Sequence, residues 1–301
     1  MATRPISLWR LRTRSLELGR RTLVMGIVNV TPDSFSDGGL YFDTSAAVAR
    51  GIRCLEEGAD LLDLGAESTR PSSAAGTESA ISAEEEQARL LPVLEGILKH
   101  RPEAVLSVDT YKAATARAAL AAGAQIINDV SGLFWDASLG AVCAQAGCGV
   151  ILMHTRGRPD EWTTQAQHGS DALLATVQAG LQASLSKAAA AGIATESILL
   201  DPGYGFGKRG DENFALLARQ RELLALGRPL LAGLSRKSFL GRALAPLFEG
   251  NPAPVDCRET AGVAAQVAAI LNGASIVRVH QVRPAVEAAL IADAILSASP
   301  A

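Results

Sequence analysis

The sequence predicts an α/β protein, a closed (β/α)8 TIM barrel in a single domain with a short N-terminal cap. Three observations predict this fold. Eight short apolar runs alternate with amphipathic stretches along 301 residues, a length that one barrel domain commonly occupies. The runs are nearly continuous, as strands of a parallel sheet buried on both faces are. A glycine stands shortly before six of them.

The apolar runs define the predicted strands. They are residues 23–30, 61–68, 105–110, 125–131, 149–155, 198–205, 229–235 and 276–282. We expect residues 1–22 to form a cap or hairpin at the bottom of a barrel that spans residues 23–298. An open, doubly wound sheet is the competing architecture, but eight repeats of strand, helix and glycine favour closure.

The stretches between the runs have helical periodicity. Residues 82–99 and 211–226 are the clearest examples, and Ser82 with Glu85 has the spacing of a capping box. A glycine that ends a helix commonly adopts a left-handed conformation before the chain turns back into the sheet. The six glycines expected to do so are Gly58, Gly123, Gly147, Gly192, Gly227 and Gly273.

Composition excludes several classes of protein. Hydrophobic residues make up 48% and charged residues 20%, which suits a folded soluble protein and not a disordered one. The 28 basic and 31 acidic residues give a net charge of −3 without basic blocks, so no nucleic-acid partner is expected. No apolar run is long enough for a transmembrane helix. The four cysteines lack metal or redox spacing, which favours free thiols and a cytoplasmic location.

Polar side chains gather at the ends of the predicted strands. Barrel enzymes place their chemistry at the carboxyl ends of their strands. A single Asn or Asp there is often a helix cap, but eight polar strand ends that converge on one mouth indicate a site. The residues are Asn29, Glu67, Ser68, Asp109, Asn128, Asp129, His154, Asp201, Ser235, Lys237, Arg278 and His280.

The residue types limit the chemistry of this site. The sequence has no G-x-S-x-G elbow and its histidines are scattered, so neither a serine hydrolase nor a histidine metal cluster is indicated. Residues 205–210 match G-x-G-x-x-G but lack the acidic residue that a dinucleotide site requires. The remaining carboxylates and amides suit a flat heterocycle with N–H donors. The cations with an Asn suit a diphosphate and its Mg²⁺.

Several strings resemble the dihydropteroate synthase family. The most specific are residues 25–39 (MGIVNVTPDSFSDGG) and 233–238 (GLSRKS), supported by 67–71 (ESTRP) and 201–208 (DPGYGFGK). Shorter strings in the family's order lie at residues 107–110, 127–130, 152–154 and 278–280. The resemblance implies a folate-biosynthesis transferase that condenses (7,8-dihydropterin-6-yl)methyl diphosphate with 4-aminobenzoate. It also implies a homodimer.

The resemblance further implies a role for each site residue. The pterin diphosphate would be bound by Thr69, Asp109, Asn128, Asp201, Lys237, Arg278 and His280. The 4-aminobenzoate pocket would consist of Phe35, Thr69, Arg70, Pro71, Phe206 and Ser238. Lys237, Arg278 and Asp109 would be the catalytic residues, and Asn29 would reach the Mg²⁺ cofactor.

Three departures from the family pattern fall outside these ligands. They are Thr155-Arg156 after His154, Gln281 after His280, and the residues after Pro71. The alternatives are a pterin-binding methyltransferase domain, an aldolase with Lys237 as the Schiff-base lysine, and a paralogue that binds pterin without catalysis. The first would need no diphosphate-binding cations, and the Asp and Asn residues around Lys237 favour hydrogen bonding over Schiff-base chemistry.

Overall fold

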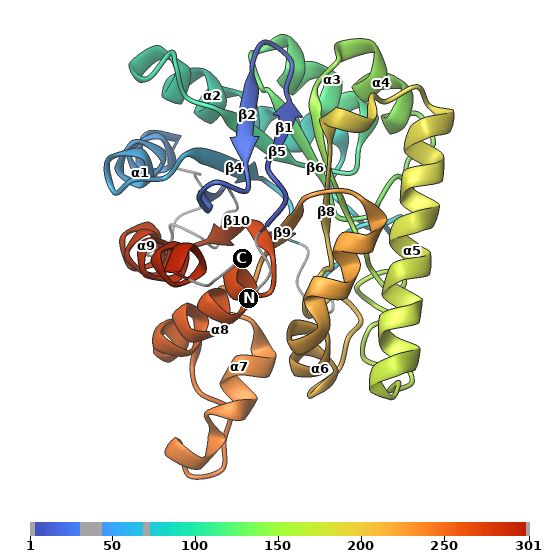
Figure 1. Ribbon diagram of the computed structural model, residues 1–301. Coiled ribbons are helices and arrows are strands. Elements are labelled where there is room, and N and C mark those ends of the chain that lie inside the picture. Colours follow the sequence, from blue (N-terminus) through green and yellow to red (C-terminus); the bar gives the residue numbers. More distant parts are fainter. Residues whose placement is uncertain (1–3, 31–43, 69–72, 299–301) are drawn as a thin grey trace.

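The computed structural model describes residues 4–30, 44–68 and 73–298, and its centre is a closed parallel barrel (Figure 1). The strand order β10-β3-β4-β5-β6-β7-β8-β9 confirms the predicted fold. The strands are β3 (Leu23–Asn29), β4 (Leu61–Gly65), β5 (Leu106–Asp109), β6 (Ile126–Asp129), β7 (Gly149–Met153), β8 (Ile198–Asp201), β9 (Leu230–Ala232) and β10 (Ala274–Val279). Each lies inside its predicted run, except that β10 begins two residues earlier than predicted.

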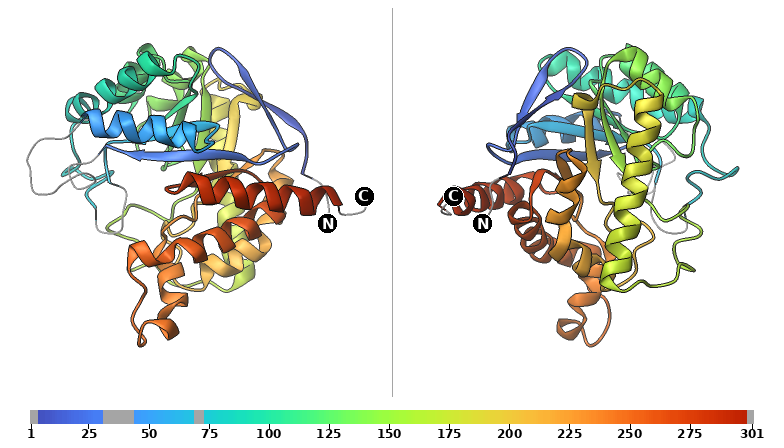
Figure 2. Two further views of the ribbon diagram at one scale, coloured as in Figure 1. Left: turned by 90° about the vertical axis from the view of Figure 1, so that its left-hand side faces the viewer. Right: turned by 45° about the vertical axis from the view of Figure 1, so that its right-hand side comes forward.

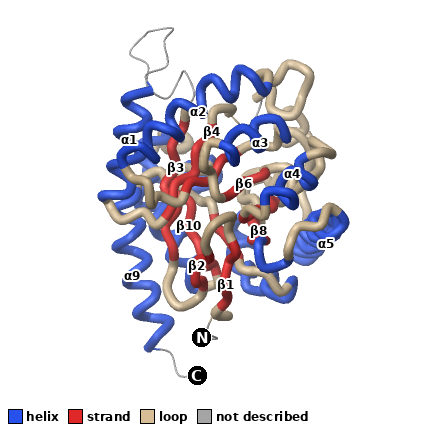
Figure 3. The backbone as a smooth tube through the Cα atoms, turned by 90° about the horizontal axis from the view of Figure 1, so that it is seen from above, coloured by secondary structure: helices blue, strands red, loops and turns tan. Residues whose placement is uncertain are grey.

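Helices surround the strands, as the view from above shows (Figure 3). They are α1 (Thr44–Glu56), α2 (Ala83–His100), α3 (Ala113–Ala121), α4 (Leu139–Ala146), α5 (Ser170–Ala190), α6 (Glu212–Arg219), α7 (Ser238–Ala243), α8 (Glu259–Leu271) and α9 (Val282–Ala298). The helix predicted over residues 211–226 is divided into α6 and a 3₁₀ segment, η3 (Gln220–Leu226). Within the described part of the chain, none of the helices combines the length and the apolar character needed to cross a bilayer.

The predicted ends of the helices are confirmed. The Ser82 side chain accepts a hydrogen bond from the backbone N–H of Glu85 at 3.1 Å, so it caps α2. All six glycines before strands have positive φ, from 62° at Gly147 to 116° at Gly123. These left-handed residues let each helix end and the chain re-enter the sheet.

The apolar core has two parts because each strand is buried on both faces. Side chains such as Leu62 and Leu64 point outward from the barrel and pack against the helices. Alternate side chains point inward and fill the lower half of the barrel; Met25 and Leu61 are among them. This alternation follows from the two-residue period of a strand. It also fixes which residues near the strand ends can face the mouth.

An N-terminal hairpin closes the bottom of the barrel. It consists of the antiparallel strands β1 (Ser7–Arg10) and β2 (Ser15–Leu18), drawn in blue in Figure 2. Trp9 is fully buried among the inward-facing barrel residues, and its indole N–H donates to the carbonyl of Ser197 at 2.8 Å. Gln125, just before β6, accepts from Thr13 at the hairpin turn. Because this end is plugged, a ligand can enter only from the carboxyl ends of the strands.

The plug predicts that Trp9→Ala destabilises the protein strongly. Loss of a fully buried indole and its hydrogen bond should lower the free energy of unfolding by about 3–5 kcal/mol. The matched control is Leu8→Ala on the same strand, where the side chain is 65% exposed and the change should stay within about 0.5 kcal/mol. Urea denaturation measures both. Similar losses of stability in the two variants would contradict the inference that Trp9 closes the bottom of the barrel.

Candidate active site

Four polar residues form one layer at the floor of the mouth. They lie on alternate strands, as the layers of a TIM barrel require, and each follows an inward apolar residue of its own strand by two positions. The polar residues are Asp63, Asn128, Asp201 and Arg278, and the apolar ones are Leu61, Ile126, Leu199 and Ile276. The apolar filling of the barrel therefore gives way to a polar surface at this level.

A hydrogen-bonded network joins the members of this layer to β5. Asp63 accepts at Oδ2 from Arg278 Nε at 2.6 Å and from Asn128 Nδ2 at 2.9 Å. Arg278 Nη2 also donates to Asp109 Oδ2 at 2.9 Å. The guanidinium is thus held by two carboxylates from neighbouring strands, and the predicted residues Asp109, Asn128 and Arg278 do lie together.

Asp63 is a member of the site that the sequence analysis missed. The predicted site residues are the last polar residues of each apolar run, whereas Asp63 precedes the end of β4. A usable signal existed, because a charged residue within the run LLDLG is unusual in a strand buried on both faces. Its position two residues after the inward-facing Leu61 places it inside the barrel.

Asp201, Arg278 and Lys237 lie close to one another beside the end of β9. A methyl group added at Gly233 would lie 3.9 Å from Asp201 Oδ2 and 4.0 Å from Arg278 Cβ, so both side chains flank the backbone there. Asp201 Oδ1 accepts from the N–H of Gly203 at 2.7 Å. Lys237 Nζ lies 4.0 Å from the centre of the Phe206 ring. Carboxylate acceptors and cationic donors therefore lie side by side at this end of the barrel.

Burial shifts the pKa values of these groups. Desolvation raises the pKa of Asp109 to about 7, although Arg278 opposes the shift. Desolvation also raises the pKa of Asp201. A backbone hydrogen bond from Gly203 and the charge of nearby Lys237 act in the opposite direction and lower this pKa. Desolvation lowers the pKa of Lys237 to about 8, although Asp201 favours the ammonium form. Several ionisable groups with perturbed pKa values in one recess are typical of an active site.

Three further predicted residues, His280, Asn29 and Ser238, lie around the rim. His280 follows β10, and its Nδ1 lies 3.0 Å from the Ser235 hydroxyl. Asn29 ends β3 and pairs in register with Gly65, which in turn pairs with Asp109. Ser238 begins α7 and is exposed. The predicted residues Phe35, Thr69, Arg70 and Pro71 lie outside the described residues.

Two polar residues near the strand ends do not face the mouth. Asp129 is outward-facing and accepts from the N–H groups of Ser131 and Leu133, so it stabilises a turn. His154 packs against α5, because a methyl group at Gly180 would meet its ring at 2.4 Å. The prediction that all the polar strand ends converge on one mouth is therefore wrong for these two residues. Glu67, after β4, forms an ion pair with Lys112 at 2.6 Å.

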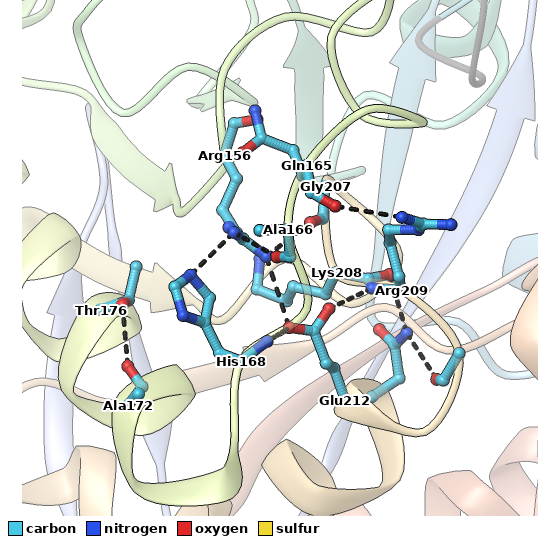
Figure 4. Close-up of polar contacts among 12 residues, drawn as sticks. Arg156, Gln165, Ala166, His168, Ala172, Thr176, Gly207, Lys208, Arg209 and Glu212 are labelled. Carbon is cyan, nitrogen blue, oxygen red and sulfur yellow. Dashed lines mark hydrogen bonds and ion pairs between the residues drawn. The ribbon is translucent and has the colours of Figure 1, made fainter.

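A second polar cluster supports the loops after β7 and β8 (Figure 4). The buried Lys208 donates to the carbonyls of His154, Gly203 and Phe206 at 3.1, 2.8 and 3.3 Å, which ties the two loops together. Arg156 contacts His168 Nε2 at 2.7 Å and Glu212 at 3.4 Å. The cluster positions Phe206 at the edge of the mouth.

The described residues could hold Mg²⁺ only together with a ligand. Among them, no group of three His, Cys, Asp or Glu residues has the arrangement of a metal cage. Asn29 supplies an amide oxygen at the rim, and Mg²⁺ is commonly bound through one or two protein oxygens plus substrate phosphates. The donor set therefore fits a cation that arrives with a phosphorylated substrate.

The closed barrel with a polar layer at its mouth is the architecture of a barrel enzyme, and a family model gives the class. The model described as pterin binding enzyme matches residues 25–280. The dihydropteroate synthase of Mycobacterium leprae is 43% identical over 92% of this chain and 94% of its own length. That of Escherichia coli is 42% identical over 91% and 92%. The chain also matches 55% of the length of a Pisum sativum mitochondrial folate synthesis bifunctional protein, at 40% identity.

Solved structures agree with these relatives. The Xanthomonas albilineans dihydropteroate synthase with 4-aminobenzoic acid has a TM-score of 0.84 and 42% identity, over 98% of this chain and all of that one. The Yersinia pestis enzyme, in a sulfonamide drug complex, has a TM-score of 0.86 and 40% identity over 97% of this chain and 100% of that one. The chain belongs to the dihydropteroate synthases, transferases of folate biosynthesis.

The crossing of the loops after β7 and β8 predicts that Gly203→Ala is strongly destabilising. Gly203 has a φ of 68°, and a methyl group there would lie 2.0 Å from the backbone oxygen of His154. Gly227 is the matched control, since its φ is 71° but nothing lies within 4 Å. Both variants place an alanine at positive φ, which should lower the free energy of unfolding by about 1–2 kcal/mol. Only Gly203→Ala should lose about 1–3 kcal/mol more, because its methyl group overpacks the crossing. Equal losses of stability for the two variants in urea denaturation would contradict the close crossing.

Proposed function

We propose that the chain condenses (7,8-dihydropterin-6-yl)methyl diphosphate with 4-aminobenzoate by a dissociative, SN1-like displacement that yields 7,8-dihydropteroate and diphosphate. The observation that carries the proposal is the layer of Asp63, Asn128, Asp201 and Arg278 with Asp109 and Lys237 beside it. This group of carboxylate and amide acceptors with two cations supports the recognition of a flat heterocycle that carries a diphosphate. Catalysis would then rest on positioning and electrostatics.

Pterin recognition is assigned to the acceptors of the floor. Asp201 would accept from the ring N–H and the exocyclic amine. The N–H of Gly203 holds its carboxylate in place through Oδ1, and Oδ2 lies beside Gly233. Asn128 and Asp109 would complete the pyrimidine edge, and Lys237 would donate to the carbonyl and ring nitrogen. Because these groups are buried or half-buried, each unmatched hydrogen bond would cost more than it does in water.

The diphosphate is assigned to the cationic side of the mouth. Arg278 would stack over the pterin and, with His280 and Thr69, bind the diphosphate. Asn29 would hold Mg²⁺ through its amide oxygen together with the phosphates. Bound there, Mg²⁺ would supply charge stabilisation to the departing diphosphate. The fixed guanidinium of Arg278 is suited to both tasks because it is planar and always charged.

The 4-aminobenzoate pocket is assigned to Phe35, Thr69, Arg70, Pro71, Phe206 and Ser238. In support, Phe206 lies beside Lys237, and Ser238 follows Lys237 directly in the chain. Lys237 would therefore lie between the two substrates. The Xanthomonas albilineans relative bound to 4-aminobenzoic acid supports a pocket of this kind.

The displacement follows from the charges around the pterin. Asp109 and Asp201 would stabilise positive charge that develops on the ring as the C–O bond breaks. Lys237 and Arg278 would stabilise the departing diphosphate. The aromatic amine is a weak base, but it needs little activation to attack a carbocation held beside it. Asp109, Lys237 and Arg278 are thus the proposed catalytic residues.

We also propose a cytoplasmic homodimer. The four cysteines are free, and three of them are buried, which suits a reducing compartment. Leu290 and Ile291 on α9 are 65% and 64% exposed, and Leu247 after α7 is 78% exposed. Such apolar side chains on the helices that follow β9 and β10 suit pairing with a second copy. Sedimentation equilibrium would measure the stoichiometry directly.

The proposal is tested by turnover and by Asp201→Asn. The wild-type protein should form 7,8-dihydropteroate from both substrates with Mg²⁺, whereas a paralogue that only binds pterin would not. Asp201→Asn should weaken binding of 6-hydroxymethylpterin by about tenfold or more, because the amide presents a donor to one of the two ligand donors. Isothermal titration calorimetry measures this. An unchanged affinity would remove Asp201 from the pterin site.

The pKa shifts predict a bell-shaped pH profile for kcat/KM. Activity should fall as the pH drops through about 7, where Asp109 gains a proton and loses acceptor capacity. It should also fall as the pH rises through about 8, where Lys237 loses its proton. Lys237→Arg, although slower, should lose the alkaline limb because arginine stays protonated. An alkaline limb that persists in this variant would exclude Lys237 as its source.

A further inference from the structure

Asp63 lies at the centre of the network, but the function proposed above assigns it no contact with either substrate. Its side chain is completely buried on β4, and Oδ2 is the shared acceptor of Arg278 Nε and Asn128 Nδ2. Its second oxygen is also buried and has no hydrogen-bond partner among the described residues. A buried carboxylate contributes little to stability unless it is fully paired. Its presence beneath the mouth therefore points to the site above it.

We propose that Asp63 is a positioning residue that sets, through one oxygen, both the orientation of the Asn128 amide and the plane of the Arg278 guanidinium. The inference rests on the pterin-binding role proposed for those two residues and extends it. Asp63 itself would not touch the substrate, since its side chain is fully buried whereas that of Arg278 is 21% exposed.

The orientation of Asn128 follows from the chemistry of its partner. An ionised carboxylate can only accept hydrogen bonds, so the NH2 end of the amide must face Asp63. The amide oxygen is then the end that remains for a ligand. A ring edge with N–H donors is matched by this orientation and opposed by the reverse one. Asp63 would therefore determine that a ligand must present a hydrogen-bond donor to Asn128.

The plane of Arg278 follows from its two carboxylate partners. Nε donates to Asp63 on β4 and Nη2 donates to Asp109 on β5. These two hydrogen bonds restrain the orientation of the guanidinium plane. The Arg278 side chain is 21% exposed, whereas Asp63 is fully buried. The guanidinium thus separates Asp63 from the mouth and presents a fixed surface to a flat ring. Without Asp63, Asp109 alone would leave the guanidinium free to pivot.

The test compares Asp63→Leu with Asp63→Asn. Leucine removes the shared acceptor, so 6-hydroxymethylpterin should bind at least about tenfold more weakly, while KM for 4-aminobenzoate should change less than about twofold. Asparagine can present an oxygen at the shared position, and it should stay within about threefold of the wild-type pterin affinity. Calorimetry gives the affinities, and steady-state kinetics gives KM.

Ser107→Ala is the matched control. Ser107 is the register neighbour of Asp63 and is equally buried, and its Oγ has no hydrogen-bond partner within residues 4–30, 44–68 and 73–298. Its loss therefore perturbs the same depth of the barrel but not the network. It should leave pterin affinity unchanged. The proposal is overturned if Asp63→Leu binds pterin like the wild type, if Ser107→Ala loses as much as Asp63→Leu, or if Asp63→Asn is no better than Asp63→Leu.

A swap keeps the test decisive if Asp63→Leu does not fold. Asn128→Asp places two acceptors opposite each other and should weaken pterin binding, and adding Asp63→Asn should restore a donor and recover at least about tenfold. Failure to recover would overturn the proposal. Failure of the wild-type protein to bind pterin would instead refute the function proposed above, so the two results are distinguishable.

Discussion

The buried pair of Asp63 and Arg278 is the interaction on which the rest of the mouth depends. The two residues come from β4 and β10, which flank β3, and their contact at 2.6 Å links the start of the barrel to its end. Neither charge could be buried there alone without a large desolvation cost. Closure of the barrel, which brings β10 beside β3, is therefore a precondition of the site.

The two ends of the barrel have different roles: the bottom is filled by apolar packing, and the mouth carries the polar layer. The hairpin and Trp9 fill the bottom, where the strands need only apolar packing. The layer that begins with Asp63 then faces a mouth bounded by loops. Those after β7 and β8 are fixed by Lys208 and by the close approach of Gly203 to His154. Stability and chemistry are thus placed at opposite ends, as in barrel enzymes generally.

The same burial that orders the site also sets its electrostatics. Asp109 and Lys237 have pKa values moved toward neutrality from opposite directions, so both can change protonation within about one unit of physiological pH. Asp63 contributes to the raised pKa of Asp109, while Arg278 opposes it. A positioning residue can therefore influence reactivity without contact with the substrate.

The sequence alone determined the fold and the family, because near-continuous apolar runs, capping glycines and the strings around Asp201 and Lys237 are local patterns. It also predicted that Asp109, Asn128 and Arg278 lie together, as they do. It did not determine which polar residues near the strand ends share one surface. Asp129 and His154 point outward and Asp63 points inward. Whether a side chain points inward or outward depends on which of the two alternating faces of its strand lines the barrel. Only the pairing of neighbouring strands fixes that choice.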